Sequence, residues 1–458
     1  MIISESLLHK YNTAVPRYTS YPPATSFDTS FKGEDFVRFV QQSNQASPHN
    51  ISIYIHIPFC PQRCHFCGCN TVLYPREEKI EEYVRCVQAE IRMTGAHVDK
   101  SRRVTQVSWG GGTPNSIKYE YIESIMNTLR EVFTFDDGAE IAIECSPAYL
   151  EFEHVDHLKA MGFNRISLGI QDFHLPVLDA INRKPPLHPV EDMLKHIKSQ
   201  GFKGVNIDLV YGLPLQTVES FAENIAEIAR LQPDRLATFS YAHVPWFNEN
   251  QKRLEIYPFP QPDEKLTMLV NTINYLSESG YDVIGMDHFA KKDDELAIAL
   301  REHNLHRNFQ GYNTKKTTGQ VYAFGASGIS QMDGAYAQNV KSTPLYVSLI
   351  QSGKYATERG YALTQQDKII RDTIDEIMCN GKLHFGSIAE KYGISMADFY
   401  ICTAFDQSKV ASQLQDGIVT LGTDSIAVNE AGMMVVRNIA AAFDPQYKPE
   451  QNKYSRTL

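Results

Sequence analysis

The chain has 458 residues, which is enough for one large domain with a substantial core and a second, smaller domain. Its 54 acidic side chains outnumber its 44 basic ones, and the net charge of -10 argues against a nucleic acid or an anionic membrane as the main partner. The first residues show no basic stretch followed by an apolar core, and no apolar run approaches the ~20 residues that span a bilayer. We therefore expect a cytoplasmic monomer with no nucleic acid partner and no membrane span.

Residues 1–48 are predicted to form an N-terminal arm, in which the segment PRYTSYPP combines prolines and aromatic side chains with Arg17. From Ser52 onward, short apolar runs alternate with amphipathic stretches of helical length. This alternation predicts parallel strands joined by helical crossovers, as in an open doubly wound sheet or in a full or partial barrel. The predicted strands are SIYIHI (52–57), VTQVSW (104–109), EIAIEC (140–145), RISLGI (165–170), VNIDLVYG (205–212) and RLATFSYA (235–242).

Residues that could bind a ligand or take part in catalysis lie at the ends of these predicted strands. A cysteine-rich loop follows the first strand, and the run from Gly110 to Pro114 follows the second. Glu144, Gln171 and Asp208 stand at or near the ends of the next three. Because parallel α/β folds bind ligands at the carboxyl ends of their strands, we expect these residues to line one active site.

After about Tyr361 the alternation of strands and helices ends. The segments DKIIRDTIDEIMCNG, FGSIAEKYG and ADFYICTAFDQSKVASQL are predicted helices, and GIVTLGTDSIAVNEAG is a predicted hairpin. This order is typical of a winged-helix module, but acidic residues outnumber basic ones between 365 and 444, which disfavours DNA binding. We assign residues 49–360 to a catalytic barrel with its extension and residues 361–458 to a mainly helical C-terminal domain.

Four cysteines lie close together in the segment HIPFCPQRCHFCGCN. Cys60, Cys64 and Cys67 have a CxxxCxxC spacing, which lets one loop place three thiolates around a single iron-sulfur cluster. A cubane cluster has four irons, so three protein ligands leave one iron open to a substrate or cofactor. The alternatives are a structural zinc site, which usually takes two separated pairs of ligands, and thiols buried in the core.

This loop resembles that of the radical S-adenosylmethionine (SAM) superfamily, in which it holds a [4Fe-4S] cluster. Over almost its whole length the chain is similar to the oxygen-independent coproporphyrinogen III oxidases, also called coproporphyrinogen dehydrogenases. The matching segments are YNTAVPRYTSYPP, YIHIPFC, CHFCGCN, WGGGTPN, IECSP, GIQDF, NIDLVYGLP, YAHVP, GMDHFA and HRNFQGY. The resemblance implies an α/β fold with a radical-SAM partial (β/α)6 TIM-like barrel. It also implies an N-terminal arm that reaches toward the substrate and a mainly helical, winged-helix-like C-terminal domain that covers it.

The same resemblance implies that Cys60, Cys64 and Cys67 ligate the cluster and that each chain holds two SAM molecules. Tyr54, Gly111, Glu144 and Ile329 match positions around the cluster-bound SAM. Phe66, Gly112, Thr113, Gln171, Arg183, Asp208 and Ala242 match positions around the second SAM, with Val210, Phe309 and Gln310 as further candidates. Judged without the resemblance, the glycine run is either a close-approach site for a ligand or an ordinary turn. Ala242 and Ile329 would then be assigned to the core.

Three further residues are candidates for catalytic roles. Cys69 lies outside the superfamily spacing and is not a cluster ligand in the resembled family, so its role stays open, with a core thiol as the alternative. His56 is a candidate proton source beside the cluster, although a structural hydrogen bond is the usual role of an isolated histidine such as His243, His288 or His306. Arg17, together with Arg307, is a candidate to hold substrate carboxylates, because a guanidinium group binds a carboxylate through two hydrogen bonds.

The resemblance implies oxidative decarboxylation of two propionates of coproporphyrinogen III to vinyl groups, which gives protoporphyrinogen IX in heme biosynthesis without oxygen. Two SAM molecules would be consumed, with an electron donor and an electron acceptor that the sequence does not identify. The alternatives are a heme chaperone built on the radical-SAM scaffold and a radical SAM methyltransferase acting on heme. Such chaperones usually lack a cysteine at the position of Cys69 and the HRNFQGY segment. The chain departs from the family at Ser146, Pro147 and Ala148, where many members have Asp-Pro-Arg.

Overall fold

The computed structural model describes residues 5–315 and 320–448. The chain divides into two compact units, each assembled from separated segments. The first unit contains residues 1–26, 261–315 and 363–458, and the second contains residues 27–260 and 316–362. These boundaries differ from the division predicted from the sequence into residues 1–48, 49–360 and 361–458, and that division stays a prediction. Residues 1–4, 316–319 and 449–458 of the predicted domains lie outside the described residues.

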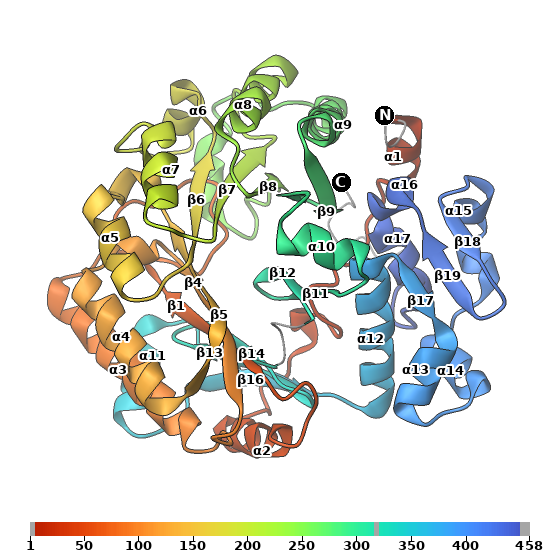
Figure 1. Cartoon of the computed structure of the whole chain (residues 1–458), viewed down its shortest axis with the longest axis horizontal. Helices are drawn as coiled ribbons and strands as arrows, with labels where there is room; N and C mark the ends of the chain where they lie inside the picture. Colours follow the sequence, from red (N-terminus) through yellow and green to blue (C-terminus); the bar gives the residue numbers. More distant parts are fainter. Residues whose placement is uncertain (1–4, 316–319, 449–458) are drawn as a thin grey trace. The chain divides into compact units, whose positions relative to one another are not determined.

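The second unit is built around a parallel sheet that contains all six predicted strands. Neighbours in the sheet follow one another along the chain, so each crossover returns to the adjacent position. The strands are β1 (Ile51–Ile57), β4 (Arg103–Gly111), β5 (Thr134–Cys145), β6 (Arg165–Gln171), β7 (Gly204–Tyr211) and β8 (Arg235–Ser240). This arrangement confirms the predicted partial (β/α)6 barrel (Figure 1).

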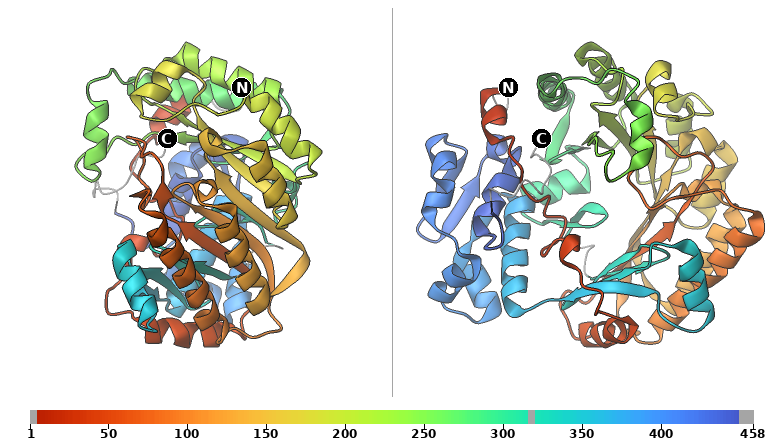
Figure 2. Two further views of the ribbon diagram at one scale, coloured as in Figure 1. Left: turned by 90° about the vertical axis from the view of Figure 1, so that its left-hand side faces the viewer. Right: turned by 180° about the vertical axis from the view of Figure 1, so that it is seen from behind.

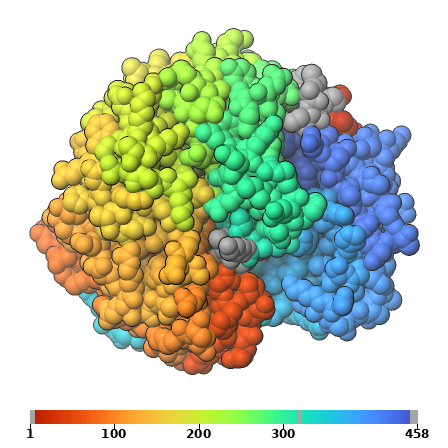
Figure 3. All heavy atoms as spheres, in the orientation of Figure 1, coloured from red at the N-terminus to blue at the C-terminus, as the bar shows by residue number. Residues whose placement is uncertain are grey.

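Helices cover the outer face of this sheet (Figure 1). In α3 (Glu77–Gly95), the buried residues Ile80, Val84, Val87 and Ile91 recur at helical spacing and therefore form one apolar stripe. The other helices of this layer are α4 (Tyr119–Val132), α5 (Phe152–Ala160), α6 (Leu175–Ala180), α7 (Val190–Ser199) and α8 (Val218–Leu231). Residues of this layer form a continuous convex surface, coloured orange to yellow-green in Figure 3.

The sheet extends beyond β1 through four strands that were not among the six predicted. β13 (Gln320–Phe324) pairs with β1 in parallel, and β14 (Ile329–Gln331), β15 (Ala335–Asn339) and β16 (Thr357–Ala362) follow in antiparallel order. Every residue of β13 and β15 is buried, so these strands lack the polar alternation of a half-exposed strand. The second unit also contains α2 (Gly33–Ser43), β2 (Phe59–Cys60), β3 (Val72–Leu73) and α11 (Thr343–Gln351).

The first unit joins residues 261–315 to the C-terminal part of the chain through a shared core. Ile284, Leu296, Leu305 and Tyr312 pack in one buried cluster with Cys379 of α12 (Gln365–Asn380). Two antiparallel hairpins belong to this unit, β9 (Tyr281–Gly285) with β10 (His288–Lys291) and β11 (Leu305–Asn308) with β12 (Gly311–Thr314). Its other helices outside the C-terminal region are α1 (Glu5–Tyr11), α9 (Pro262–Glu278) and α10 (Glu295–Arg301).

The C-terminal region has the predicted winged-helix-like order of helices followed by a hairpin (Figure 2, right). The third predicted helix is shorter than expected, because α14 ends at Thr403 and Ala404 takes a left-handed conformation with φ of 48°. The elements are α12, β17 (Lys382–His384), α13 (Phe385–Tyr392), α14 (Met396–Thr403), α15 (Ala411–Gln415), β18 (Val419–Leu421), β19 (Ser425–Val428), α16 (Glu430–Met433) and α17 (Val436–Ala440). Within the described residues, no helix has both the length and the apolar composition needed to cross a membrane.

Candidate active site

The cysteine-rich loop connects β2 to β3 at the carboxyl end of β1, and the glycine run after β4 holds its base. The Gly112 amide donates to the Ile57 carbonyl at 2.7 Å, and the Thr113 amide donates to the Phe59 carbonyl at 2.9 Å. A Cβ atom on Gly112 would lie 2.7 Å from the carbonyl oxygens of Pro58 and Phe59. Glycine is therefore required at position 112 for the two backbones to approach this closely.

The loop and the strand ends surround a cavity of about 180 Å³. The cavity lies in the second unit, and the strand-end residues singled out in the sequence line it together. The predicted site residues in its wall are Cys60, Cys64, Phe66, Cys67, Cys69, Gly111, Gly112, Thr113, Glu144, Gln171, Arg183 and Asp208. The expected meeting of these residues at one edge of the sheet is observed, and the individual ligand roles stay predictions.

Two of the three spaced thiols accept hydrogen bonds that favour a thiolate. The Thr113 hydroxyl donates to Cys60 Sγ at 3.4 Å, and Arg183 Nη1 donates to Cys64 Sγ at 3.4 Å. Burial raises the pKa of Cys60 and Cys64, and these two donors act in the opposite direction. A hydrogen bond from the Cys69 thiol lowers the pKa of Cys67. Cys69 thus contacts Cys67 and lies in the wall of the same cavity.

The wall opposite the thiols carries carboxylates and an amide. Glu144 faces the cavity but is otherwise enclosed by protein, and this enclosure, with the charge of Asp208, raises the pKa of Glu144 to about 7. Asp208 accepts hydrogen bonds from the Ser167 hydroxyl at 2.9 Å and from Asn206 Nδ2 at 2.7 Å. Gln171 has a φ of 73°, a strained conformation for a residue with a side chain, at an irregularity in the pairing of β6 with β7.

His56 lies beneath the glycine run and is buried. Its Nε2 lies 3.0 Å from the Asn70 carbonyl oxygen, so Nε2 carries the proton, and Nδ1 accepts from the Tyr54 hydroxyl at 3.2 Å. Burial lowers the pKa of His56 to about 4, which leaves the ring neutral near pH 7. This neutral, doubly hydrogen-bonded ring favours a structural role, and the predicted role as a proton source remains untested.

Several predicted site residues lie outside the wall of this cavity. Ala242 is exposed and Ile329 is half-buried, and their assignment to the SAM sites stays a prediction. Ala242 follows β8, and its carbonyl accepts from Gln251 Nε2 at 3.3 Å. Arg17 belongs to the first unit, where it pairs with Asp287.

Three amide side chains that the sequence analysis did not single out hold the cysteine-rich loop. Asn248 Nδ2 donates to the Cys67 carbonyl at 2.6 Å, Asn250 Nδ2 to the Cys64 carbonyl at 3.1 Å and Gln251 Nε2 to the Phe66 carbonyl at 3.2 Å. These residues lie about 180 positions after the loop, and no local motif marks them. They lie in the connection that follows β8. Their position after the carboxyl end of a barrel strand is the only feature of the sequence that could have indicated that they lie near the site.

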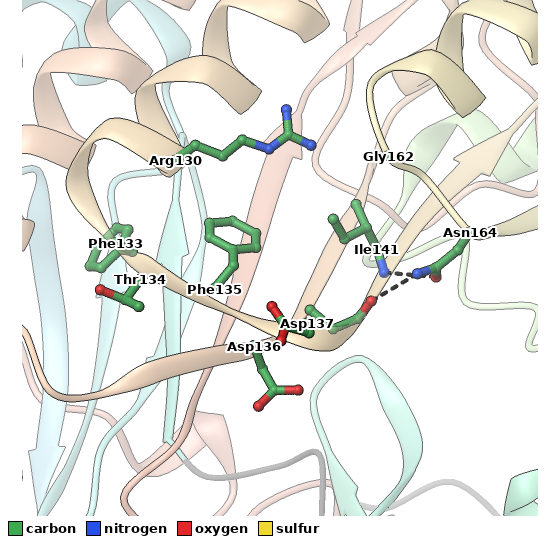
Figure 4. A pocket seen from close by; sticks show the side chains of 10 residues that line it. Arg130, Phe133, Thr134, Phe135, Asp136, Asp137, Ile141, Gly162 and Asn164 are labelled. Atoms are coloured by element: carbon green, nitrogen blue, oxygen red, sulfur yellow. Dashed lines mark hydrogen bonds between the residues drawn. The ribbon is translucent and has the colours of Figure 1, made fainter.

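A wider hollow of about 540 Å³ lies at the opposite edge of the sheet, where β5 begins (Figure 4). Phe135, Asp136, Asp137 and Arg130 line it, and Asn164 donates to the Ala139 carbonyl at 2.8 Å. No predicted site residue contributes to its wall. The amino-terminal edge of a parallel sheet is not where such folds place their chemistry, so we assign the site to the smaller cavity.

Comparisons with known proteins agree with this site. The family description of the Radical SAM superfamily matches residues 54–228, which include the second half of β1, the cysteine-rich loop and the chain through β7. The oxygen-independent coproporphyrinogen III oxidase of Synechocystis sp. is 40% identical over 458 aligned residues, covering 99% of this chain and 98% of the relative. This chain belongs to the oxygen-independent coproporphyrinogen III oxidases. The relative from Escherichia coli (strain K12) is likewise 40% identical, over 99% of this chain and 98% of its own length.

The fold of this oxygen-independent coproporphyrinogen III oxidase is shared with a solved structure. Coproporphyrinogen III oxidase (HemN) from Escherichia coli, described as a radical SAM enzyme, superposes with a TM-score of 0.89 at 38% identity. The match covers 97% of this chain and 99% of the other. The protein is therefore a radical SAM enzyme, and its cofactors are a [4Fe-4S] cluster and SAM.

The residues present fit these cofactors. A structural zinc site usually takes two separated pairs of ligands, whereas Cys60, Cys64 and Cys67 lie in one loop. A cubane cluster needs one thiolate for each of three separate irons, and the hydrogen bonds that Cys60 and Cys64 accept favour such thiolates. The carboxylates and the glycine run offer partners for the amino, carboxyl and ribose groups of SAM.

The departure from the family pattern lies in the same wall. Asn115 holds this segment, because its Oδ1 accepts from the Ser146 amide at 2.9 Å and its Nδ2 donates to the Ser146 carbonyl at 3.1 Å. Pro147 is buried, and Ala148 lines the cavity. This is the position at which the resemblance led us to expect an arginine.

Proposed function

We propose that this enzyme converts two propionates of coproporphyrinogen III into vinyl groups without oxygen and thereby forms protoporphyrinogen IX in heme biosynthesis. The observation that carries the proposal is the match of 40% identity to oxygen-independent coproporphyrinogen III oxidases over nearly the full length of both chains. The three spaced thiols, the glycine run and the strand-end carboxylates around one cavity support it.

In this proposal Cys60, Cys64 and Cys67 hold the cluster and leave one iron for SAM. When bound, these cofactors would supply the radical chemistry that removes a hydrogen atom from a propionate, using one electron from a donor; loss of CO2 and of one electron to an acceptor would then leave the vinyl group. The protein's task is to position these groups and to exclude water.

The proposal places two SAM molecules on each chain. Tyr54, Gly111, Glu144 and Ile329 are assigned to the first SAM. Phe66, Gly112, Thr113, Gln171, Arg183, Asp208 and Ala242 are assigned to the second. The enclosed carboxyl of Glu144, with a pKa of about 7, can accept a hydrogen bond from an ammonium or a ribose hydroxyl near neutral pH. Arg183 donates to Cys64 Sγ and lines the cavity, and in this proposal it also binds the carboxylate of the second SAM.

The proposal also includes an electron donor and an electron acceptor, neither of them identified. We further expect the enzyme to be a monomer and to be located in the cytoplasm.

The test is an anaerobic assay of the reconstituted enzyme with coproporphyrinogen III, SAM and a chemical reductant. We expect two CO2, two methionines and two 5′-deoxyadenosines for each protoporphyrinogen IX formed, and no product from Cys67→Ser. Cys402→Ser, which changes a cysteine far from the loop in sequence and absent from the cavity wall, is the matched control and should keep full activity. A methylated tetrapyrrole, or transferable bound heme with no turnover, would instead identify one of the two alternative functions.

A further inference from the structure

The connection that follows β8, residues 241–260, exposes large apolar side chains to solvent. Trp246 is 80% exposed, Phe247 81% and Ile256 78%. Among the described residues, these are the three most exposed large apolar side chains. Single exposed apolar residues are common on protein surfaces, but several in one short segment indicate a surface that binds a partner.

The same connection is firmly anchored on its inner side. Gln251 and Leu254, both in the short helix η4 (Glu249–Leu254), are buried. Leu254 belongs to a buried apolar cluster against which Phe66 of the cysteine-rich loop also packs. The amide side chains of the connection donate to backbone carbonyls of that loop. The connection thus turns polar side chains inward and large apolar ones outward, which is the reverse of the usual distribution.

The exposed aromatic pair lies beside the backbone that carries the predicted cluster ligands. Asn248 follows Phe247 directly, and its Nδ2 donates to the Cys67 carbonyl at 2.6 Å. The remaining cysteines, which are widely separated in the sequence, are Cys86, Cys145, Cys379 and Cys402. They provide no ligand set for a second iron-sulfur cluster that could relay an electron through the protein. An electron donor therefore has to approach the cysteine-rich loop itself.

Two arginines near this contact carry charge that the protein does not neutralise. Arg63 in the cysteine-rich loop and Arg253 in η4 are both exposed, and within the described part of the chain neither forms an ion pair. The two carboxylates of the connection, Glu249 and Glu255, have basic neighbours of their own at 3.6 and 3.3 Å. Unpaired cations attract and orient an acidic partner, whereas the net charge of -10 disfavours its contact elsewhere on the chain.

We propose that Trp246, Phe247, Arg63 and Arg253 form a docking face for an acidic protein that carries a one-electron redox group. The aromatic pair supplies the apolar centre of the interface and the arginines supply its charged contacts, as is usual for protein interfaces. In the complex the reduced partner is oxidised by one electron, and the cluster held by the adjacent loop is reduced by one. The need for this electron rests on the proposed function, whereas the docking face rests on exposure and charge.

The test compares a protein donor with a small one on the reconstituted enzyme under anaerobic conditions. The protein donor is a reduced acidic flavodoxin, and the small donor is dithionite. We expect Trp246→Ala, Phe247→Ala and Arg253→Glu each to slow reduction of the cluster by flavodoxin, followed by its visible absorbance, by about tenfold or more. Reduction by dithionite should be unchanged, because dithionite needs no docking face. Arg63 is left unchanged in this test because it also lines the cavity.

Binding is measured separately from electron transfer. Calorimetry with oxidised flavodoxin and the full chain should show an affinity that is about tenfold lower in each variant and that falls as salt is added. Lys203→Glu is the charge control, because Lys203 is exposed and precedes β7 at the opposite edge of the sheet. Ile401→Ala is the apolar control, because Ile401 is 74% exposed on α14. Both controls should bind and accept electrons as the wild type does.

Three results would overturn the proposal. The first is a wild type that does not bind flavodoxin, or three variants that bind it and are reduced by it as the wild type is. The second is an equal loss of reduction with dithionite, which would assign the residues to the cluster site. The third is a wild-type dimer in sedimentation that the variants dissociate, which would identify a second copy of the chain as the occupant.

The two proposals can fail separately. Flavodoxin binding and SAM cleavage that depend on the docking face, without any vinyl formation, would support the face and contradict the proposed function. Vinyl formation driven by flavodoxin at the wild-type rate in all three variants would do the reverse.

Discussion

Glu90 on α3 is a buried carboxyl whose ionisation should be visible in the stability of the protein. It is 3% exposed and accepts hydrogen bonds from the Tyr346 hydroxyl at 2.7 Å, the Gly325 amide at 2.8 Å and Asn339 Nδ2 at 2.7 Å. Burial raises the pKa of Glu90 to about 7, and the three hydrogen bonds oppose this rise. The side chain therefore anchors the turn that leads from β13 to Ile329.

The sign of the effect follows from where the proton binds more tightly. In the folded protein Glu90 titrates near pH 7, whereas in the unfolded chain it titrates near its ordinary value of 4.5. Between these two values the folded state holds more protons than the unfolded state, so stability falls as pH rises. The difference in pKa corresponds to ~3 kcal/mol, fully lost above about pH 7.

Glu90→Gln removes this titration while keeping the size of the side chain. The glutamine cannot accept hydrogen bonds from all three donors, and this lowers the stability of the variant by an amount that does not depend on pH. Only the wild type should lose stability as the pH rises from 4.5 to 7. We expect the free energy of unfolding of the wild type, relative to Glu90→Gln, to fall by ~3 kcal/mol between about pH 4.5 and pH 8. Glu90→Ala should be destabilised at every pH, since it leaves three buried donors without an acceptor at about 1–3 kcal/mol each.

The measurement is urea unfolding of the cluster-free protein, followed by circular dichroism at several pH values. Glu81→Gln is the matched control, because Glu81 lies on the exposed side of the same helix and forms an exposed ion pair with Arg85. Its difference from the wild type should stay within a few tenths of a kcal/mol. A difference between the wild type and Glu90→Gln that does not change with pH would refute the reasoning.

Three other predictions concern the cavity. Serine at Cys60, Cys64 or Cys67 should abolish binding of iron and sulfide, whereas Cys69→Ser should retain both, and equal retention in all four variants would contradict the ligand assignment. Gly112→Ala should destabilise the protein by about 1–3 kcal/mol and weaken SAM binding, because its Cβ would lie 2.7 Å from two carbonyl oxygens. Gly68→Ala, with no atom within 4 Å of the added carbon, is its control in thermal unfolding, and equal midpoints would contradict the steric argument. Asp208→Ala should remove one of two SAM binding events in anaerobic calorimetry while the cluster is retained, and a wild type that binds a single SAM would exclude the second site.

Sequence patterns were sufficient where the structure follows local rules. The six strands of the barrel and the helices between them were recognisable from the sequence, because β1 is an almost continuously buried run, β6 alternates between buried and half-buried residues, and the helices bury one face. The cavity residues were also predictable, since the carboxyl ends of parallel strands lie at one edge. The spacing of Cys60, Cys64 and Cys67 within one loop likewise needs no distant partner.

Patterns failed where distant segments meet. The packing of residues 261–315 with α12 was not predicted, because it depends on apolar residues of the hairpins that meet a helix far along the chain. The amides Asn248, Asn250 and Gln251 and the carboxyl of Glu90 were equally invisible. A single polar residue forms no repeating pattern in the sequence, so the sequence does not show which distant residue it contacts.

By itself the sequence determined the alternation of parallel strands and helices, the cysteine-rich loop and the set of residues at the strand ends, because these depend on short-range spacing and on the geometry common to parallel sheets. The choice of a partial barrel over an open sheet came from the family resemblance. The tertiary structure alone decided which segments share a core, which backbone carbonyls the amides hold and which apolar side chains stay exposed. Those features depend on contacts between residues far apart in the chain. Such contacts are selected by packing and by the cost of burying unpaired polar groups, and neither quantity can be read from neighbouring residues.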